Sequence, residues 1–168
     1  SDAVVSTMRE AGATLSALAG FVAMSEQLSH AAFDEFARRI MQNARGIQVL
    51  GWVEEIPREE LAATEQRVIA AGYPMFRIRE RGPEGYNVPV SPRAYYAPML
   101  MIHPMQDNAA AHGFDLASLP DRRATMDLAR TTGKVVMTER ITLVQEALGQ
   151  FATAAFQPVY HPTGKFRG

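Results

Sequence analysis

The sequence predicts an α+β fold, in which a long N-terminal helical stalk precedes an antiparallel sheet with flanking helices. Two observations carry this prediction. Apolar residues recur at helical spacing through the first 45 positions, and from Ile47 onward short runs of β-forming residues alternate with helical segments. Because two helices precede a mixture of short strands and helices, an antiparallel sheet with helices on one side accounts for the order of the elements.

Composition narrows the classes of protein to which the chain can belong. Its 168 residues are the size of one domain or of two small lobes. With 17 Lys and Arg against 18 Asp and Glu, the net charge of −1 gives no electrostatic footprint for nucleic acid. The absence of Cys excludes disulfides, thiolate zinc sites and Cys nucleophiles. The uncharged runs at 11–25 and 147–164 are shorter than a span of about 20 residues, so no transmembrane segment is predicted.

The helical stalk comprises residues 1–45. Its apolar spacing predicts one helix over residues 3–25 and a second over 29–44, with Ser29 as the N-cap of the second and Gly46 as a stop signal. The seven-residue repeat of the first helix fits two interpretations, a dimer seam or a stripe that packs on the chain's own lobes, and the sequence does not decide between them. The repeat consists of Val4, Met8, Ala11, Leu15, Leu18 and Val22.

The rest of the chain, residues 46–168, alternates strands and helices. Residues 47–53 are rich in β-forming residues and predict a strand, and Gly72 with Pro74 ends a helix predicted for 58–71. We further predict strands at 75–80 and 94–102, a loop at 81–93, a helix that Ser118 caps and Gly133 ends, strands at 134–138, 140–144 and 151–160, and a turn at 161–164.

Charged and metal-ligating side chains give weaker signals. Arg77, Arg79 and Arg81 alternate along the predicted strand at 75–80 and just beyond it, which suits either the binding of a ligand carboxylate or a solvated strand face. A second group gathers His and Asp within a short segment, which leaves a small metal-dependent enzyme as an alternative, although the spacing matches no compact ligand motif. That group is His103, Asp107, His112 and Asp115.

Several sequence blocks, in order from Phe36 to Tyr160, resemble the CHASE domain family, the extracytoplasmic sensor domains of receptor histidine kinases and diguanylate cyclases. Each block alone is a weak signal, and their order and spacing make the resemblance specific. The blocks are Gly46–Val53 with Pro57, Ala71–Ile78, Tyr96–Met99, Gly113–Leu116 with Arg122 and Arg123, Ala129–Lys134 with Thr138, and Pro158–Tyr160.

The resemblance implies PAS-like lobes in residues 46–168 and a small-molecule pocket walled by strands at 76–79, 94–101 and 152–156. Ala94 stands where the cytokinin receptors of the family carry an Asp that grips adenine, so a cytokinin-type purine is disfavoured. Plain core packing is the competing interpretation of the same residues. The ligand-binding residues implied by the resemblance are Phe76, Ile78, Arg79, Ala94, Tyr96, Met99, Met101, Thr138, Ile141, Ala154 and Phe156.

The resemblance also implies where the domain lies in the cell and how it is anchored. We expect a periplasmic or extracellular domain of an inner-membrane receptor, anchored in the membrane on both sides of this segment, with no catalysis and no cofactor of its own. A homodimer through the first helix remains open, as does a purely structural dimerisation module. Because the chain ends just after the turn at 161–164, we expect the last lobe to be incomplete.

Overall fold

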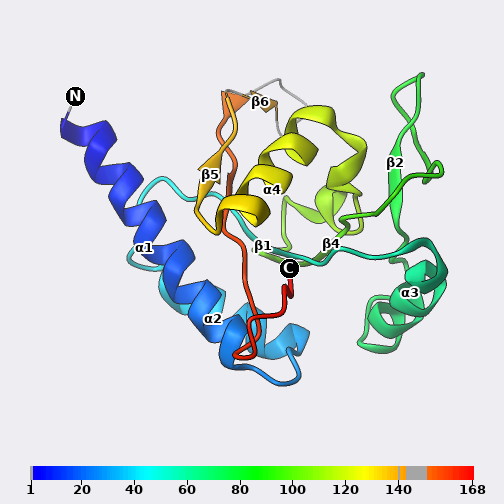
Figure 1. Cartoon of the computed structure of the whole chain (residues 1–168), viewed down its shortest axis with the longest axis horizontal. Helices are drawn as coiled ribbons and strands as arrows, with labels where there is room; N and C mark the ends of the chain where they lie inside the picture. The colour runs from blue at the N-terminus through cyan, green and yellow to red at the C-terminus, as the bar shows by residue number, and fades with distance from the viewer. Residues whose placement is uncertain (1, 140, 143–150) are drawn as a thin grey trace.

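The computed structural model describes residues 2–139, 141–142 and 151–168. It confirms an α+β fold with a long N-terminal helix (Figure 1). The helices are α1 (Asp2–Met24), α2 (His30–Met41), α3 (Leu61–Ala70) and α4 (Pro120–Thr132), with short 3-10 turns η1 (Arg58–Glu60), η2 (Ala109–Ala111) and η3 (Leu116–Ser118). The strands are β1 (Leu50–Val53), β2 (Arg79–Arg81), β3 (Asn87–Pro89), β4 (Met99–His103), β5 (Val136–Met137), β6 (Ile141–Thr142), β7 (Phe151–Ala152) and β8 (Ala155–Phe156).

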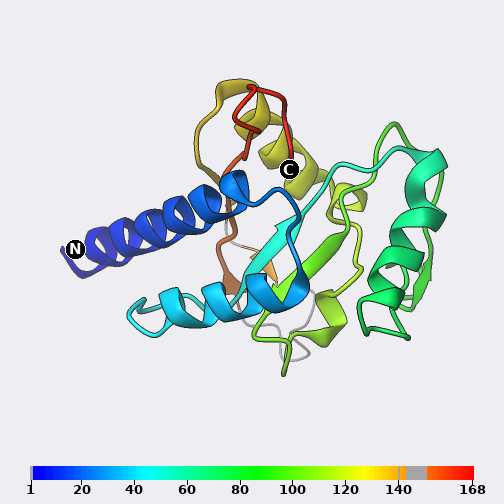
Figure 2. The same cartoon turned by 90° about the horizontal axis from the view of Figure 1, so that it is seen from below.

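The centre of the molecule is the antiparallel pair of β1 and β4. Their register places Leu50 opposite His103 and Trp52 opposite Met101, and it shifts at a bulge after Trp52. α2 and α4 lie on opposite sides of this pair, as Figures 1 and 2 show together. Helices therefore flank both faces of the central strands, where the sequence predicted one side.

The described strands form four two-stranded sheets, β1–β4, β2–β3, β5–β8 and β6–β7, all antiparallel. One of them corrects the predicted loop at 81–93, because β3 lies inside it and pairs with β2. Gly82, Pro83 and Gly85 occupy the tight turn between the two strands, where Gly82 N donates to Tyr86 O at 2.8 Å and closes it, whereas Pro89 is the last residue of β3.

Several predicted boundaries also move. The strand expected at 75–80 is reduced to β2, and the one at 94–102 begins only at Met99, because Pro98 has no N–H to donate to a ladder. The strand at 151–160 is broken into β7 and β8. Of the strand at 140–144, the structure describes β6 alone, and the remaining residues lie outside the described part.

Local signals fix the ends of two helices. Ser29 caps α2 as predicted, since its hydroxyl accepts from Ala32 N at 3.1 Å. Gly133 ends α4 in the left-handed conformation, with a φ of 68°. The predicted cap at Ser118 is wrong: α4 begins one residue later, after Leu119, with Pro120 in its first turn, while the Ser118 hydroxyl donates to Asp115 O at 2.6 Å.

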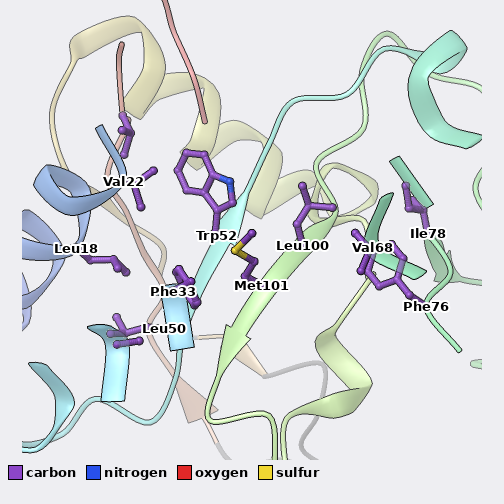
Figure 3. Close-up of a cluster of buried hydrophobic side chains, with 12 residues drawn as sticks. Leu18, Val22, Phe33, Leu50, Trp52, Val68, Phe76, Ile78, Leu100 and Met101 are labelled. Carbon is purple, nitrogen blue, oxygen red and sulfur yellow. The ribbon is translucent and has the colours of Figure 1, made fainter. Parts of the chain in front are cut away.

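The hydrophobic core joins α1 and α2 to the central strands (Figure 3). Val22 of α1 lies toward Trp52, and Leu18 of α1 lies on the side of Phe33 and Leu50. Apart from this group, Leu100 of β4 faces the far part of the core, which consists of Val68, Phe76 and Ile78. Burial of these side chains supplies the main stabilisation of the fold.

The predicted apolar stripe of α1 changes its environment along the helix. Leu18 and Val22 are buried against the chain's own core, whereas Met8 is 52 % exposed, and the side chain of Val4 lies outside the described part. The stripe thus packs on the chain itself over its C-terminal half, and its role in a dimer stays a prediction.

None of the helices in the described part of the chain has the length and apolar character that a membrane span requires.

A buried charge cluster links β2, the segment before β4 and η3. We define it as Glu80, Arg93 and Asp115, in which the Arg93 guanidinium contacts both carboxylates. Asp115 is fully buried, and its other oxygen accepts from Ala97 N at 2.7 Å and from Ala117 N at 3.0 Å. Burial opposes the charge on Arg93, but the two carboxylates outweigh it and raise the arginine's pKa.

We predict that Asp115→Ala lowers the free energy of unfolding by about 3–5 kcal/mol, because it removes one of the two carboxylates that pair with the buried Arg93 guanidinium and leaves two backbone N–H groups without their acceptor. Urea denaturation measures the change. Glu35→Ala is the matched control, since Glu35 forms an exposed ion pair with Arg38 on α2, where loss of the pair has little effect. Equal denaturation midpoints for the two variants would show that the cluster does not hold the fold together.

Candidate ligand-binding cavity

A cavity of about 730 Å³ lies between the central strands, α4, β8 and α1. Its wall is formed mainly by β1 with Met99, one face of α4, the segment at 152–158 and the N-terminal half of α1, and Met137 of β5 also contributes. Most of the side chains on this wall are apolar. Both the volume and the apolar wall with scattered polar groups are typical of small-molecule sites in proteins.

A glycine shapes the β1 part of the wall. Gly51 has no side chain, and a Cβ built there would lie 2.2 Å from the Sδ of Met99. The thioether of Met99 therefore lies directly over the β1 backbone. Any larger residue at position 51 would displace Met99, and so this glycine fixes the shape of this wall.

The α4 wall follows from helical spacing. Arg122, Met126 and Ala129 are separated by four and three residues, which places them on one face of the helix. Across the cavity, Ala154 is held by paired hydrogen bonds, from Thr138 N to Ala154 O at 2.8 Å and from Ala154 N to the Thr138 hydroxyl at 3.0 Å. Three small side chains, those of Ala152, Ala154 and Ala155, all lie on this wall.

Helix α1 completes the wall. Met8, Ala11 and Leu15, three positions of its seven-residue repeat, face the cavity together with Thr7. Farther along the same stripe, Leu18 and Val22 belong to the core. The apolar stripe therefore contacts the cavity with its N-terminal part and the core with its C-terminal part, because positions seven residues apart on a helix share a face.

Charged side chains on the cavity wall form ion pairs or hydrogen bonds with other side chains of the protein. Arg130 pairs with Glu55, and Arg122 donates to Asp121 at 2.7 Å. Asp127 accepts from the Tyr95 hydroxyl at 2.5 Å. Burial of Tyr95 and this hydrogen bond to a carboxylate raise the pKa of the phenol, so the hydroxyl keeps its proton and remains a donor to Asp127.

One buried polar atom on the wall has no partner. Within the described part of the chain, Oε1 of Gln157 is buried and accepts no hydrogen bond. Gln157 lies beside Phe156 and Pro158, which also line the cavity. Buried side-chain oxygens in native proteins nearly always have a donor, so this atom is an exception, and it is closed off from water-sized groups in the cavity.

The structure brings three of the predicted ligand-binding residues to the wall, Met99, Ala154 and Phe156. Phe76, Ile78 and Met101 lie in the hydrophobic core, and the Thr138 side chain is buried. The side chain of Ile141 lies outside the described part. The pocket was expected to reach 76–79, but its wall follows β1, α4 and α1 instead, and ligand contact stays a prediction for every one of these residues.

Three predicted residues lie before the central strand or on β2. Ala94 is exposed, and Tyr96 is fully buried, with its hydroxyl donating to Ser91 O at 3.1 Å. The guanidinium of Arg79 donates to the carbonyls of Ala110 and His112 at 2.7 and 2.6 Å, so it braces the loop at 109–113. Burial lowers the pKa of Arg79.

The His and Asp residues of the segment 103–115 point to different partners. His103 Nδ1 lies 2.6 Å from Asp34 of α2, His112 Nε2 lies 2.9 Å from Leu100 O, and Asp115 belongs to the buried charge cluster. Among the residues that the structure describes, no three His, Asp or Glu side chains are placed to hold a metal ion together.

Two histidines share one backbone carbonyl. Nε2 of His30 and Nε2 of His112 lie 3.0 and 2.9 Å from Leu100 O, which makes both rings donors at Nε2. Tyr73 packs against both rings. Burial lowers the pKa of both histidines, against the hydrogen bond to Leu100, and the charge of Arg67 near His30 and of Arg79 near His112 lowers it further.

Sequence reasoning missed the cavity's contributions from Gln157, from the α4 face and from α1. A lone Gln beside Pro158 gives no local signal of burial. The α4 face carried a usable one, since Arg122, Met126 and Ala129 repeat at helical spacing. The α1 stripe was recognised, but nothing in the sequence showed that its N-terminal half borders a cavity.

Comparison with known families identifies the CHASE domain. The family model matches residues 26–167, which is most of the chain. The match begins after α1 and includes the central strands, α4 and the cavity wall at 152–158. No curated protein matches the sequence significantly.

We predict that the protein loses stability as the pH falls below about 6.5. The pKa values of His30 and His112 are lowered in the folded state, so the unfolded chain binds more protons in this range and acid favours unfolding. Their contribution is complete above the unfolded value of about 6.5 and falls as the pH drops towards the folded values. Urea denaturation at pH 7.5 and 5.5 measures the difference.

His112→Gln is expected to reduce this pH dependence, because the amide keeps a donor near Leu100 O without titrating. His161→Gln, in the turn at 161–164, is the matched control and is expected to keep the full dependence. A pH dependence that is the same in His112→Gln, His161→Gln and the unaltered protein would contradict the prediction.

Proposed function

Because this chain belongs to the CHASE domain family, the extracellular sensory domains of signalling receptors, we propose that it binds a small molecule in the cavity described above. The CHASE domain is a sensory and not a catalytic domain. The proposal adds to family membership a specific site, the cavity of about 730 Å³ between β1, α4, β8 and α1, which is the observation that carries it.

The rest of the receptor belongs to the same proposal. We propose a membrane-anchored bacterial receptor with a histidine kinase or diguanylate cyclase as output and with this domain in the periplasm. The near-neutral charge supports a small-molecule rather than a nucleic-acid partner. No observation on the described residues favours the metal-dependent enzyme that the His103–Asp115 segment suggested.

The wall of the cavity supports a route for the signal. α1 borders the cavity through Met8, Ala11 and Leu15, so a bound molecule would contact this helix directly. A ligand shifts the equilibrium between two arrangements only by its difference in affinity for them. In this proposal, the ligand favours one position of the N-terminal half of α1 relative to β1 and α4.

We predict that filling the cavity with a large side chain weakens the binding of a small apolar molecule. The probe is N-phenyl-1-naphthylamine, a neutral apolar fluorophore whose emission rises in apolar surroundings. The unaltered protein is expected to bind it saturably at one site, and Ala154→Trp is expected to weaken binding at least about tenfold by occupying the space. Ala13→Trp, on the exposed side of α1, is the matched control and is expected to bind as before.

A second variant that fills the cavity keeps the test decisive if the first variant does not fold. If circular dichroism shows that Ala154→Trp is unfolded, Met126→Trp fills the same cavity from α4. A thermal-shift screen of metabolites then seeks the natural ligand, since a molecule that binds the native state raises the melting temperature. Failure of both the fluorophore and the screen to bind would refute the proposed function.

We also propose a homodimer through the exposed part of α1. Val5 is about half exposed there, whereas Ala11 and Leu15 line the cavity and Leu18 and Val22 lie in the core. Val5→Glu is expected to convert the dimer to a monomer in light scattering, because it places a charge in the apolar contact. Ser6→Glu, on another face of the helix, is expected to leave the mass unchanged, and a monomeric unaltered protein would rule the contact out.

A further inference from the structure

We propose that a strap, residues 166–168, couples the cavity to the end of helix α1, and that Arg167 is the positioning residue of this coupling. The strap belongs to a small antiparallel hairpin in which Phe166 lies opposite Tyr160. The inference rests on the proposed function and deepens it, because it names how an occupied cavity would act on α1.

The strap contacts different partners with its two faces. Phe166 and Gly168 line the cavity, whereas Arg167 between them donates to the carbonyls of Val22 and Ser25 at the end of α1, with Ser25 O at 2.6 Å. Successive side chains of an extended segment point to opposite sides. Neighbours in the sequence therefore contact the cavity and the helix, and the red segment of Figure 1 can be followed past the end of α1.

The cavity face of the strap is also attached to α4. The Arg130 guanidinium lies over the ring of Phe166, 4.6 Å from its centroid, and the ring of Tyr160 meets Phe166 edge-on, with the centroids 5.8 Å apart. The Tyr160 hydroxyl donates to Arg130 O at 3.0 Å, which ties the hairpin to the end of α4. A molecule that packs against Phe166 therefore acts on a side chain that the hairpin shares with α4.

The last residue of the strap lies against β1. Gly168 O accepts from Val159 N at 2.8 Å, and a Cβ built on Gly168 would lie 2.5 Å from both the Trp52 ring and Val53 O. Val159 and Trp52 belong to the hydrophobic core. The strap thus bridges the core, the cavity and α1 within three residues.

The strap is held more weakly than the core. Phe166, Arg167 and Gly168 are each only half-buried, and the turn at 162–165 that leads into the strap is exposed. Segments with little burial open at a lower free energy than the core does. A ligand that packs against the closed strap and not against the open one favours the closed arrangement by that difference in affinity.

Coupling of this kind acts in both directions. If a ligand stabilises the closed strap, it strengthens the hold of Arg167 on α1, and loss of that hold weakens ligand binding by the same factor. The wall of the cavity includes Phe166 and Gly168 but not Arg167. An effect of Arg167 on affinity would therefore be transmitted through the strap.

The first test measures the binding of N-phenyl-1-naphthylamine to variants of the hairpin. Arg167→Met removes the donor to the α1 carbonyls, and Lys165→Met is the matched control, because Lys165 is exposed and both changes remove one positive charge. We expect Arg167→Met to bind the probe about fivefold more weakly than the unaltered protein, which is the lower end of typical coupling between sites. Lys165→Met is expected to bind as before, and Arg167→Lys, which keeps a cation near the carbonyls, to recover part of the affinity.

Amide hydrogen exchange then distinguishes coupling from a loss of stability. Ser25 N donates to Val22 O at the end of α1, and Gly72 N donates to Ile69 O at the end of α3, which does not line the cavity. With the probe at about twice its Kd, we expect the Ser25 amide of the unaltered protein to exchange about threefold more slowly, as mass action requires of an opening that releases the ligand. The Gly72 amide is the control and is expected to exchange as before.

The same measurement is repeated on Arg167→Met, in which the Ser25 amide is expected to lose its response to the probe. A variant that is merely less stable would exchange faster with and without the probe but would keep the response. If Arg167→Met does not fold, the Ser25 and Gly72 amides of the unaltered protein still decide the matter.

The outcomes separate the two proposals. Equal affinities of Arg167→Met and Lys165→Met, or a Ser25 amide whose exchange is the same with and without bound probe, would overturn the coupling and leave small-molecule binding in the cavity intact. Failure of the probe and of every metabolite of the thermal-shift screen to bind the unaltered protein would overturn the proposed function and this inference together.

Discussion

The buried carboxylate of Asp115 connects the two walls on which the cavity depends. One of its oxygens receives N–H groups from Ala97, just before β4, and from Ala117, in the turn that leads into α4. Arg93 then ties the other oxygen to Glu80 on β2. A buried ion pair contributes little net stability compared with apolar packing, but removing one member is costly. The cluster thus constrains where α4 lies over the central strands more than it adds to overall stability.

Helix α1 depends on this framework and also extends beyond it. Its C-terminal half is fixed by Leu18 and Val22 in the core, by stacking of Phe21 on Phe36 at 4.3 Å, and by Arg167, which donates to Ser25 O at 2.6 Å. A cation at the end of a helix satisfies carbonyls that have no partner within the helix. The N-terminal half has no comparable burial and borders the cavity instead.

The sequence predicted the features that are encoded locally. The four helices follow from apolar spacing, from the cap at Ser29 and from the left-handed stop at Gly133, each of which operates within a few residues. Strand pairing depends on residues far apart in the chain, so neither the β2–β3 hairpin nor the separation into four small sheets could be predicted from one sequence. For the same reason, the cavity wall was predicted only in part. Met99, Ala154 and Phe156 were predicted from the sequence, but the missing hydrogen-bond partner of the Gln157 oxygen depends on residues far away in the chain.

The arrangement of the walls determines where a ligand would act on the proposed receptor. Of the wall elements, β1 pairs with β4, and Asp115 of the buried charge cluster ties the segment before β4 to the turn that leads into α4, so a bound molecule has little freedom to separate these parts of the wall. α1 is fixed at one end and borders the cavity with the other, through Met8 and Leu15. A ligand that fills the space changes the contacts of this less constrained half most, because packed cores resist deformation while weakly buried segments do not. The family match begins at residue 26, after α1, so in this protein the cavity joins the matched domain to the helix that precedes it.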